Sequence, residues 1–329
     1  MTDIARIAAG PKIREYARKH GYSDWMVARW IHMTKQLDVP TGRVLEGLQH
    51  RPPSYLRANP LRIDAPELQK RMEARGFELE PTKLDPNLFR VYQAPLSIGA
   101  TQEHLLGFTT PQDAASASAP LALRAGSAEA VVDMAAAPGV KTLHVAGDME
   151  NQGVLVATDP EPKRIRALRF NLERCGVQNA ALRCHTGQEL PGEEWVDKVL
   201  LDAPCTGEGT LPKDRTRRRG KVEEFSELVS LQKELLEAAD RILRPGGTLV
   251  YATCTFAPEE NEGQVQSMLD RGYKLDPLPF NEFSGEKLLP GVPEWPGLEL
   301  DDMSKCRRFL PGIHDTLGFF VAKLTKGAN

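Results

Sequence analysis

The chain has 329 residues, of which 41% are hydrophobic and 26% are charged, a composition typical of a globular protein that buries a large core. Its formal net charge is only −3, which excludes an overall basic surface, so a polyanionic partner would have to bind a local patch. The five cysteines are dispersed and form no CxxC pair, which argues against a disulfide framework and a metal site and favours a reducing, cytoplasmic location.

The amino-terminal segment is expected to be helical. Its first twenty residues lack a long apolar core, and no apolar run approaches the length of a membrane span, so we expect neither a signal peptide nor a membrane anchor. Residues 4–37 predict two helices, the second capped by Ser23. A stripe of apolar side chains on the second helix is interpreted as core packing: Trp25, Met26, Trp30 and Met33. Residues 40–55 contain a Pro pair and predict a connection.

A small α/β module is predicted next. Its expected elements are a strand at 55–64, a helix at 67–75 that Gly76 ends, and two strands at 77–80 and 88–92. We place the boundary near residue 105, which divides the chain into a helical and small α/β domain, 1–105, and a larger domain, 106–329.

Strands and helices alternate from residue 130 onward. The predicted strands are 130–134, 153–158, 180–184, 196–202 and 248–253, with later ones near 273–276 and 318–324. The predicted helices are 141–149, 163–175 and 223–243. Such alternation indicates an α/β fold of the Rossmann-like type, a mainly parallel seven-stranded sheet with helices on both faces.

A loop of small residues follows the first strand of this sheet. In VVDMAAAPGVKT, 131–142, three alanines and Gly139 would let a ligand approach the backbone at a helix amino terminus. A turn without a ligand explains the loop equally well. Asp159 ends the next strand, where a carboxylate can accept hydrogen bonds from a ribose or cap a helix. Together, and without GxGxxG, loop and acid favour a nucleoside-containing cofactor other than a nicotinamide.

Two cysteines follow strands of the same predicted sheet. Cys205 lies in VLLDAPCTGEGT and Cys254 in LVYATCTFAPEEN, among Pro, Gly and polar residues, whereas the other three cysteines are expected to be buried. Methylation of cytosine at carbon 5 needs such an arrangement: a thiolate adds to carbon 6 and makes carbon 5 nucleophilic. Asp202 would stabilise charge at the ring's N3, and a second thiol would help to remove the carbon 5 proton.

These motifs resemble those of the NOL1/NOP2/Sun family of RNA 5-methylcytosine methyltransferases. The chain looks closest to archaeal tRNA methyltransferases of this family that lack an appended RNA-binding domain. The matching segments are RANPLRI (57–63), SIGATQEHLLGFTTPQDAAS (97–116), DMAAAPGVKT (133–142), LLDAPCTGEGTLPKD (200–214) and YATCTFAPEENE (251–262).

The resemblance implies roles for individual residues. Cys254 would be the nucleophile and Cys205 would assist release, with Asp202 and Lys141 beside them. S-adenosylmethionine would be the cofactor. Its implied binding residues are Ala135, Ala136, Ala137, Pro138, Gly139, Val140, Lys141, Asp159, Arg164, Thr186 and Asp202.

Two positions depart from the family pattern. Val140 replaces the second Gly of the usual APGGKT loop, and a β-branched residue tolerates positive φ badly. At the end of the third strand, where the family usually has Asp, the chain offers His185 and Thr186, so Thr186 would have to make the adenine contact.

A basic run directly follows the Cys205 motif. Its charged side chains are predicted to contact RNA phosphates: Lys213, Arg215, Arg217, Arg218, Arg219 and Lys221. A solvated loop is the alternative. The amino-terminal domain offers further basic residues, among them Arg51, Arg57 and Arg62. The expected partner is RNA, with tRNA preferred to rRNA through the resemblance alone, and the protein is expected to act as a monomer.

Two other classes of function remain open. A non-catalytic RNA-binding protein could keep the methyltransferase fold, but the intact Asp202, Cys205 and Cys254 set opposes this. A methyltransferase for small molecules or proteins would leave both thiols unexplained.

Overall fold

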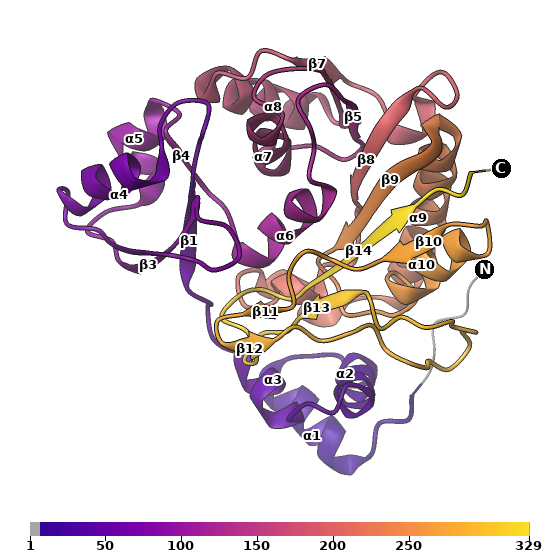
Figure 1. The fold of residues 1–329 in the computed structure, drawn as a ribbon. Helices are drawn as coiled ribbons and strands as arrows, with labels where there is room; N and C mark the ends of the chain where they lie inside the picture. Colours follow the sequence, from indigo (N-terminus) through magenta and orange to yellow (C-terminus); the bar gives the residue numbers. More distant parts are fainter. Residues whose placement is uncertain (1–6, 329) are drawn as a thin grey trace.

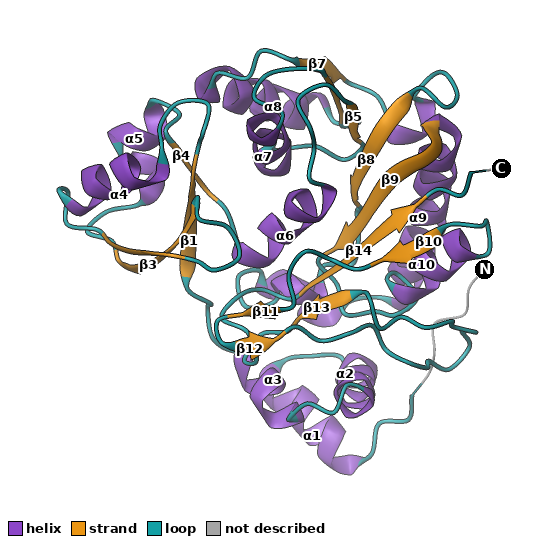
Figure 2. Ribbon diagram, in the orientation of Figure 1, coloured by secondary structure: helices purple, strands orange, loops and turns teal. Residues whose placement is uncertain are grey.

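The computed structural model describes residues 7–328 (Figures 1 and 2). Its centre is a sheet of the order β10-β14-β9-β8-β5-β6-β7, with β13 paired to β14. The strands are β5 (Ala130–Asp133), β6 (Val154–Thr158), β7 (Ala180–Arg183), β8 (Val196–Asp202), β9 (Leu243–Thr253), β10 (Lys274–Asp276), β13 (Arg307–Phe309) and β14 (Phe319–Thr325). The strands from β7 to β9 are parallel, and β14 is antiparallel to β9. The predicted fold class is confirmed.

Apolar runs place the strands inside the molecule. Val131, Val132, Leu200, Leu249 and Val250 are fully buried, because helices cover both faces of the sheet. The helices of this region are α6 (Ala114–Leu123), α7 (Val140–Asp148), α8 (Pro162–Cys175), α9 (Val222–Ile242) and α10 (Glu262–Leu269). One hydrophobic core joins α9 and α10 to the sheet, and another joins α6 and α7 to it. Residues 114–120 (AASASAP), a run of mostly small residues, therefore belong to a core helix.

The amino-terminal helices pack against the carboxy-terminal half of the chain. They are α1 (Pro11–His20), α2 (Asp24–Gln36) and α3 (Thr41–Gly47). Ser23 precedes α2, as expected, although its side chain makes no capping hydrogen bond. Met26, Trp30 and Met33 are buried in one cluster with Phe256 and residues of the 292–313 segment, so the core interpretation of this stripe is confirmed. Figure 1 shows α1–α3 next to the segment that carries β11–β13.

The predicted connection at 40–55 is wrong in its first half, because residues 41–47 form α3. Pro40 precedes this helix, and only the later Pro52–Pro53 pair lies in extended chain. Gly47 is needed there: a Cβ at this position would lie 2.3 Å from the backbone nitrogen of Gly312.

A separate four-stranded sheet has the order β2-β3-β1-β4. Its strands are β1 (Ser54–Ala58), β2 (Glu78–Pro81), β3 (Leu88–Gln93) and β4 (Thr109–Pro111), and α4 (Ala65–Glu73) covers it. The predicted strand at 55–64 ends early, because the Asn59 side chain turns to the carbonyls of Gly107 and Cys175. Residues 7–105 thus form two packed groups, the helices α1–α3 and the four-stranded sheet with α4. The division of the chain at residue 105 stays a prediction.

The remaining short elements connect these parts. They are α5 (Gln102–Leu105), the β11 (Glu282–Phe283) and β12 (Glu286–Lys287) hairpin, and 3-10 turns at Ile98–Ala100, Gly187–Glu189, Glu208–Thr210 and Arg215–Arg219. Within residues 7–328, none of the helices is both long and apolar enough to cross a membrane.

Candidate active site

The sulfur atoms of Cys205 and Cys254 lie 3.2 Å apart. Cys205 follows β8 and Cys254 follows β9, and these parallel strands are paired so that Asp202 lies opposite Ala252. Both loops therefore emerge at the same edge of the sheet, and the Cys254 backbone N–H also donates to the Cys205 sulfur at 3.3 Å. Both cysteines are partly exposed, whereas Cys175 and Cys306 are buried. Cys184, which was expected to be buried, is exposed on the loop after β7.

Lys141 and Asp202 form an ion pair beside the two sulfurs. The Lys141 Nζ lies 2.6 Å from the Asp202 Oδ2, and it also lies 5.5 Å from the centre of the Phe319 ring. Burial acts to lower the pKa of Lys141, but Asp202 and the sulfur of Cys254 outweigh it, so the pKa is raised. Lys141 therefore stays charged near neutral pH, and the structure brings all four residues proposed for catalysis together.

The Cys205 thiol is held in its protonated form. Its pKa is raised well above the usual value, first because Cys254 is its hydrogen-bond partner and second because the surrounding protein shields the sulfur from most of the solvent. The charges of Cys254, Glu260 and Asp202 act in the same direction. The pair thus consists of a protonated Cys205 next to the sulfur of Cys254, the arrangement in which one thiol can remain a proton carrier while the other is the nucleophile.

The loop after β5 is shaped by Gly139. This residue has φ of +106°, and a Cβ on it would lie 2.6 Å from the Leu168 Cδ1. Val140 begins α7 and is not among the residues with positive φ. The left-handed conformation therefore falls entirely on Gly139, and Val140 is accommodated without backbone strain. Ala135 and Val140 are half-buried, and Pro138 is exposed, so the loop opens to solvent.

The acid at the end of β6 fits a nucleoside. Asp159 is fully buried, its Oδ1 accepts the Glu161 N–H, and its Oδ2 lies 3.1 Å from the Arg164 Nη1. The Oδ2 has no protein hydrogen-bond partner in the described chain. Arg164 also donates to the Ala137 carbonyl at 2.7 Å, which ties this acid to the small-residue loop. A buried carboxylate whose Oδ2 has an ion pair with Arg164 but no hydrogen bond keeps room for one more donor, and next to a loop of small residues this suits a ribose hydroxyl.

Thr186 lies at the same edge but makes only local contacts. Its N–H donates to Glu189, and His185 lies 3.2 Å from the same carboxylate. The next residue, Gly187, is buried, and a Cβ there would lie 2.9 Å from the Met134 Cε, so this turn packs directly on the end of β5. The adenine contact of Thr186 stays a prediction.

Sequence reasoning missed Asp133, the last residue of β5. It is fully buried and accepts a hydrogen bond from Thr142 at 2.7 Å. Burial raises its pKa to about 6, although Thr142 and Lys141 act to lower it. The signal was available, since an acid inside an apolar strand is costly without partners.

The basic run divides into two kinds of side chain. Lys213 lies 3.6 Å from Asp113, Arg217 donates to the Thr206 carbonyl, and Arg218 donates to the His20 carbonyl and covers the Tyr22 ring. These three hold the loop onto the molecule. The other members, Arg215, Arg219 and Lys221, are exposed, as is Lys213.

Arg57 does not belong to an RNA-binding surface. It is only 6% exposed and pairs with Asp85 at 2.9 Å, so it joins β1 to the turn between β2 and β3. Elsewhere in residues 7–328, no cluster of three or more His, Cys, Asp or Glu side chains is arranged to hold a metal ion.

The sheet order, the small-residue loop after β5 and the acid after β6 define a Rossmann-like methyltransferase fold. The family model described as 16S rRNA methyltransferase RsmB/F matches residues 120–325, and the chain belongs to this family. This match confirms the predicted resemblance to the NOL1/NOP2/Sun methyltransferases. It also confirms S-adenosylmethionine as the predicted cofactor.

Two solved structures cover nearly the whole chain. A methyltransferase homolog protein from Pyrococcus horikoshii is 36% identical with a TM-score of 0.83, and the match covers 96% of this chain and 99% of that one. NSun6 from the same organism, solved with SFG, is 23% identical with a TM-score of 0.79, over 97% and 99% of the two chains, which supports the fold.

Curated relatives are longer than this chain. The ribosomal RNA small subunit methyltransferase F of Vibrio parahaemolyticus is 38% identical over 278 residues, which is 82% of this chain and 56% of that protein. The protein of the same name from Cronobacter sakazakii is 37% identical, over 83% of this chain and 57% of its own. The chain therefore spans little more than half the length of these relatives.

Proposed function

We propose that this protein transfers a methyl group from S-adenosylmethionine to carbon 5 of a cytosine in RNA, through a covalent bond between Cys254 and the base. The observation that carries this proposal is the 3.2 Å separation of the two sulfurs beside the Lys141–Asp202 pair. A fold of this kind needs no thiol for simple methyl transfer, whereas carbon 5 of cytosine needs a nucleophile to activate it.

The residues divide the steps between them. The Cys254 sulfur forms a bond to carbon 6, and the electron pair of the carbon 5–carbon 6 double bond becomes available at carbon 5. Asp202, in its acid form and held by Lys141, would donate a proton to N3, which neutralises the negative charge that develops on the ring, and would take this proton back when the ring double bond re-forms. When bound, S-adenosylmethionine would supply an electrophilic methyl group to carbon 5, and the S–CH3 bond would break to leave the neutral thioether S-adenosylhomocysteine. The carbon 5 proton then leaves, the double bond re-forms, and the bond from Cys254 to carbon 6 breaks with its electrons returning to sulfur.

Cys205 is suited to accept that last proton only after the adduct has formed. In the free protein its pKa is raised mainly by its contact with Cys254. Once the Cys254 sulfur is bonded to carbon 6, its part in raising the pKa of Cys205 is removed, whereas burial and the charges of Glu260 and Asp202 remain. Cys205 therefore loses its proton more readily in the adduct than in the free protein.

The substrate we propose is small subunit rRNA. The relatives that are 37–38% identical carry rRNA in their names, whereas the tRNA expected from the sequence is not confirmed. The exposed Arg215, Arg219 and Lys221 would contact phosphates near the base pocket. A cytoplasmic location and a monomeric state stay predictions.

Bisulfite sequencing of total RNA from a deletion strain and from a complemented strain tests this proposal. We expect one protected cytosine in 16S rRNA to be lost in the deletion strain and restored by the intact gene. Loss of a site in tRNA instead would overturn the rRNA assignment, and no loss in any RNA would overturn cytosine methylation.

A further inference from the structure

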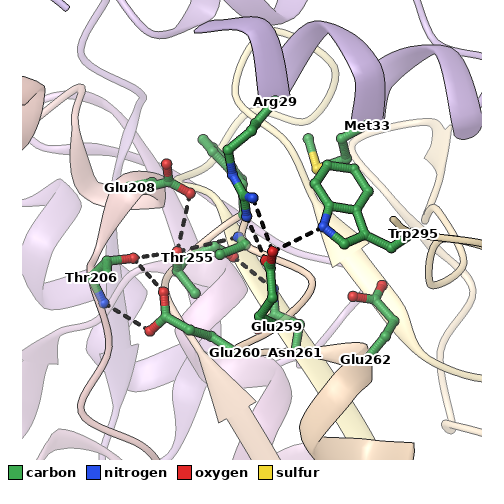
Figure 3. A network of polar contacts seen from close by, with 12 residues as sticks. Arg29, Met33, Thr206, Glu208, Thr255, Glu259, Glu260, Asn261, Glu262 and Trp295 are labelled. Atoms are coloured by element: carbon green, nitrogen blue, oxygen red, sulfur yellow. Dashed lines mark hydrogen bonds and ion pairs between the residues drawn. The ribbon is translucent and has the colours of Figure 1, made fainter. Parts of the chain in front are cut away.

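A run of buried polar side chains lies behind the two cysteines. Glu259, Glu260, Asn261 and Glu262 are each at most 2% exposed, although three of them carry carboxyl groups. Burial of such groups is costly unless each one is hydrogen-bonded, so the partners of this segment show what it does. Figure 3 shows that these side chains reach toward different segments of the chain.

Glu260 holds the residues on both sides of Cys205. Its carboxylate accepts the Thr206 N–H at 3.0 Å and the Thr206 hydroxyl at 2.6 Å. Gln232 of α9 donates to the same carboxylate at 2.9 Å and to the Pro204 carbonyl at 2.9 Å. The backbone before Cys205 and the backbone after it are therefore fixed from one point.

The same group of side chains reaches the residues around Cys254. The hydroxyls of Thr206 and Thr255 lie 2.7 Å apart, which joins the loop of one cysteine to the loop of the other. Asn261 accepts the Thr253 hydroxyl at 2.5 Å and donates to the Thr255 carbonyl at 3.1 Å. Both chain neighbours of Cys254 are thus held by Asn261.

The other two glutamates serve different parts of the fold. Glu259 pairs with Arg29 of α2 and accepts the Trp295 indole N–H at 3.1 Å. Glu262 pairs with Arg308 at 2.5 Å and accepts the Val292 N–H at 2.8 Å. These contacts join distant segments, but neither carboxylate bonds a residue adjacent to a cysteine.

We propose that Glu260 and Gln232 are positioning residues that, through Thr206 and Thr255, hold the Cys205 and Cys254 sulfurs within reach of one another. Their importance for methylation rests on the proposed function, whereas their effect on the distance between the sulfurs does not. Neither residue touches the base or the cofactor in this role.

The contacts that Glu260 and Gln232 make with the two cysteine loops, here called the clamp, depend on hydrogen bonds rather than on charge. A glutamine at position 260 can accept the Thr206 N–H and the Gln232 amide with its oxygen, and donate to the Thr206 hydroxyl with its nitrogen. That hydroxyl then turns to donate to Thr255, so each of the three groups that contact Glu260 keeps its hydrogen bond to residue 260. An alanine at position 260 leaves the Thr206 N–H, the Thr206 hydroxyl and one Gln232 proton without their acceptor.

Oxidation of the two thiols by diamide measures their proximity without any substrate. Diamide takes one hydrogen from each thiol and leaves a disulfide, which mass spectrometry detects as a loss of two hydrogens. Cys184→Ser is included in every variant, because that cysteine is exposed. The variants are Glu260→Ala, Glu260→Gln and Gln232→Leu, with Glu262→Gln as the matched control that weakens a neighbouring buried glutamate.

We expect Glu260→Ala and Gln232→Leu to slow disulfide formation and to lower kcat for methylation by about tenfold or more, since small misplacements at a site have large effects on rate. The KM for S-adenosylmethionine should stay close to that of the parent, and Glu260→Gln should restore both rates. Glu262→Gln should lower Tm but leave disulfide formation unchanged.

Parent-like disulfide formation in Gln232→Leu and Glu260→Ala would overturn the proposal, as would a Glu260→Gln variant as slow as Glu260→Ala. If Glu260→Ala does not fold, Gln232→Leu decides by itself. If the parent protein methylates no RNA but its oxidation still depends on Glu260, the proposed function fails and the clamp stands.

Discussion

The ammonium group of Lys141 lies 2.6 Å from the Asp202 carboxylate, where the loop after β5 meets the end of β8. The two side chains are 15% and 27% exposed, so solvent screens the pair only in part. Lys141 comes from the first turn of α7 and thereby joins the small-residue loop to the loop that carries Cys205. One ion pair thus fixes the side chain that would face both cofactor and base.

Asp202→Asn should reduce methylation strongly while the protein stays folded. The amide keeps the shape of the side chain but cannot pass a proton to N3, so we expect kcat to fall by about 100-fold. The unpaired Lys141 should lower the free energy of unfolding by on the order of 1–3 kcal/mol. Single-turnover kinetics and urea denaturation measure the two effects, and a kcat close to that of the parent would remove Asp202 from the reaction.

Cys254→Ala should abolish methylation without loss of cofactor binding. The substitution removes the only atom proposed to bond carbon 6, whereas the loop around Gly139 and Asp159 is untouched. Isothermal titration with S-adenosylmethionine and a tritium-transfer assay test the two parts separately. Substantial residual turnover would show that Cys254 is not the nucleophile.

Cys205→Ala should accumulate a covalent protein–RNA adduct. Without the second thiol the carbon 5 proton leaves slowly, so the bond from Cys254 to the base persists. The adduct is expected as a slow-migrating band under denaturing conditions, and it should disappear in the Cys205→Ala, Cys254→Ala double variant. An active RNA that gives no such band would contradict the release role.

Val140→Gly and Gly139→Ala should differ in their effect on cofactor affinity. Val140 has no positive φ, so Val140→Gly should leave cofactor affinity within about twofold and cost at most about 1 kcal/mol of helix stability. Gly139→Ala places a Cβ where Leu168 lies and forces alanine to positive φ, which should cost about 1–3 kcal/mol and weaken binding. Equal affinities in the two variants would contradict this division of the loop.

The stability of the protein should depend on pH through Asp133. Burial raises its pKa from 3.8 to about 6, so the folded state binds a proton more tightly than the unfolded state does. Its contribution to the free energy of unfolding is therefore greatest below the unfolded pKa and is lost as pH rises through the folded pKa of about 6.

The parent should consequently lose up to about 3 kcal/mol relative to Asp133→Asn between acidic and neutral pH. Urea denaturation of both proteins across that range measures the difference. A difference that does not change with pH would mean that Asp133 is not the buried titrating group.

Local sequence pattern is enough to predict the central sheet and the edge at which the catalytic residues lie. Uninterrupted apolar runs such as Val199–Leu201 read as buried parallel strands, and the motifs that follow such strands must lie at their carboxyl ends. The convergence of Cys205, Cys254, Asp202 and Lys141 was therefore predictable from local pattern. The sequence also showed that Val140 replaces a glycine of the usual family loop. It did not show that Gly139 takes the positive φ and leaves Val140 in an ordinary helical conformation.

The partners of the buried polar groups become known only from the folded chain. Arg57 looks like a surface cation in sequence but is buried against Asp85, and Arg29 pairs with Glu259, 230 residues away. The helix at 41–47 and the division of residues 7–105 into two packed groups were likewise not predicted from the sequence. Hydrophobic periodicity is a local property that sequence displays directly, whereas the acceptor of a buried donor depends on which distant segments meet when the chain folds.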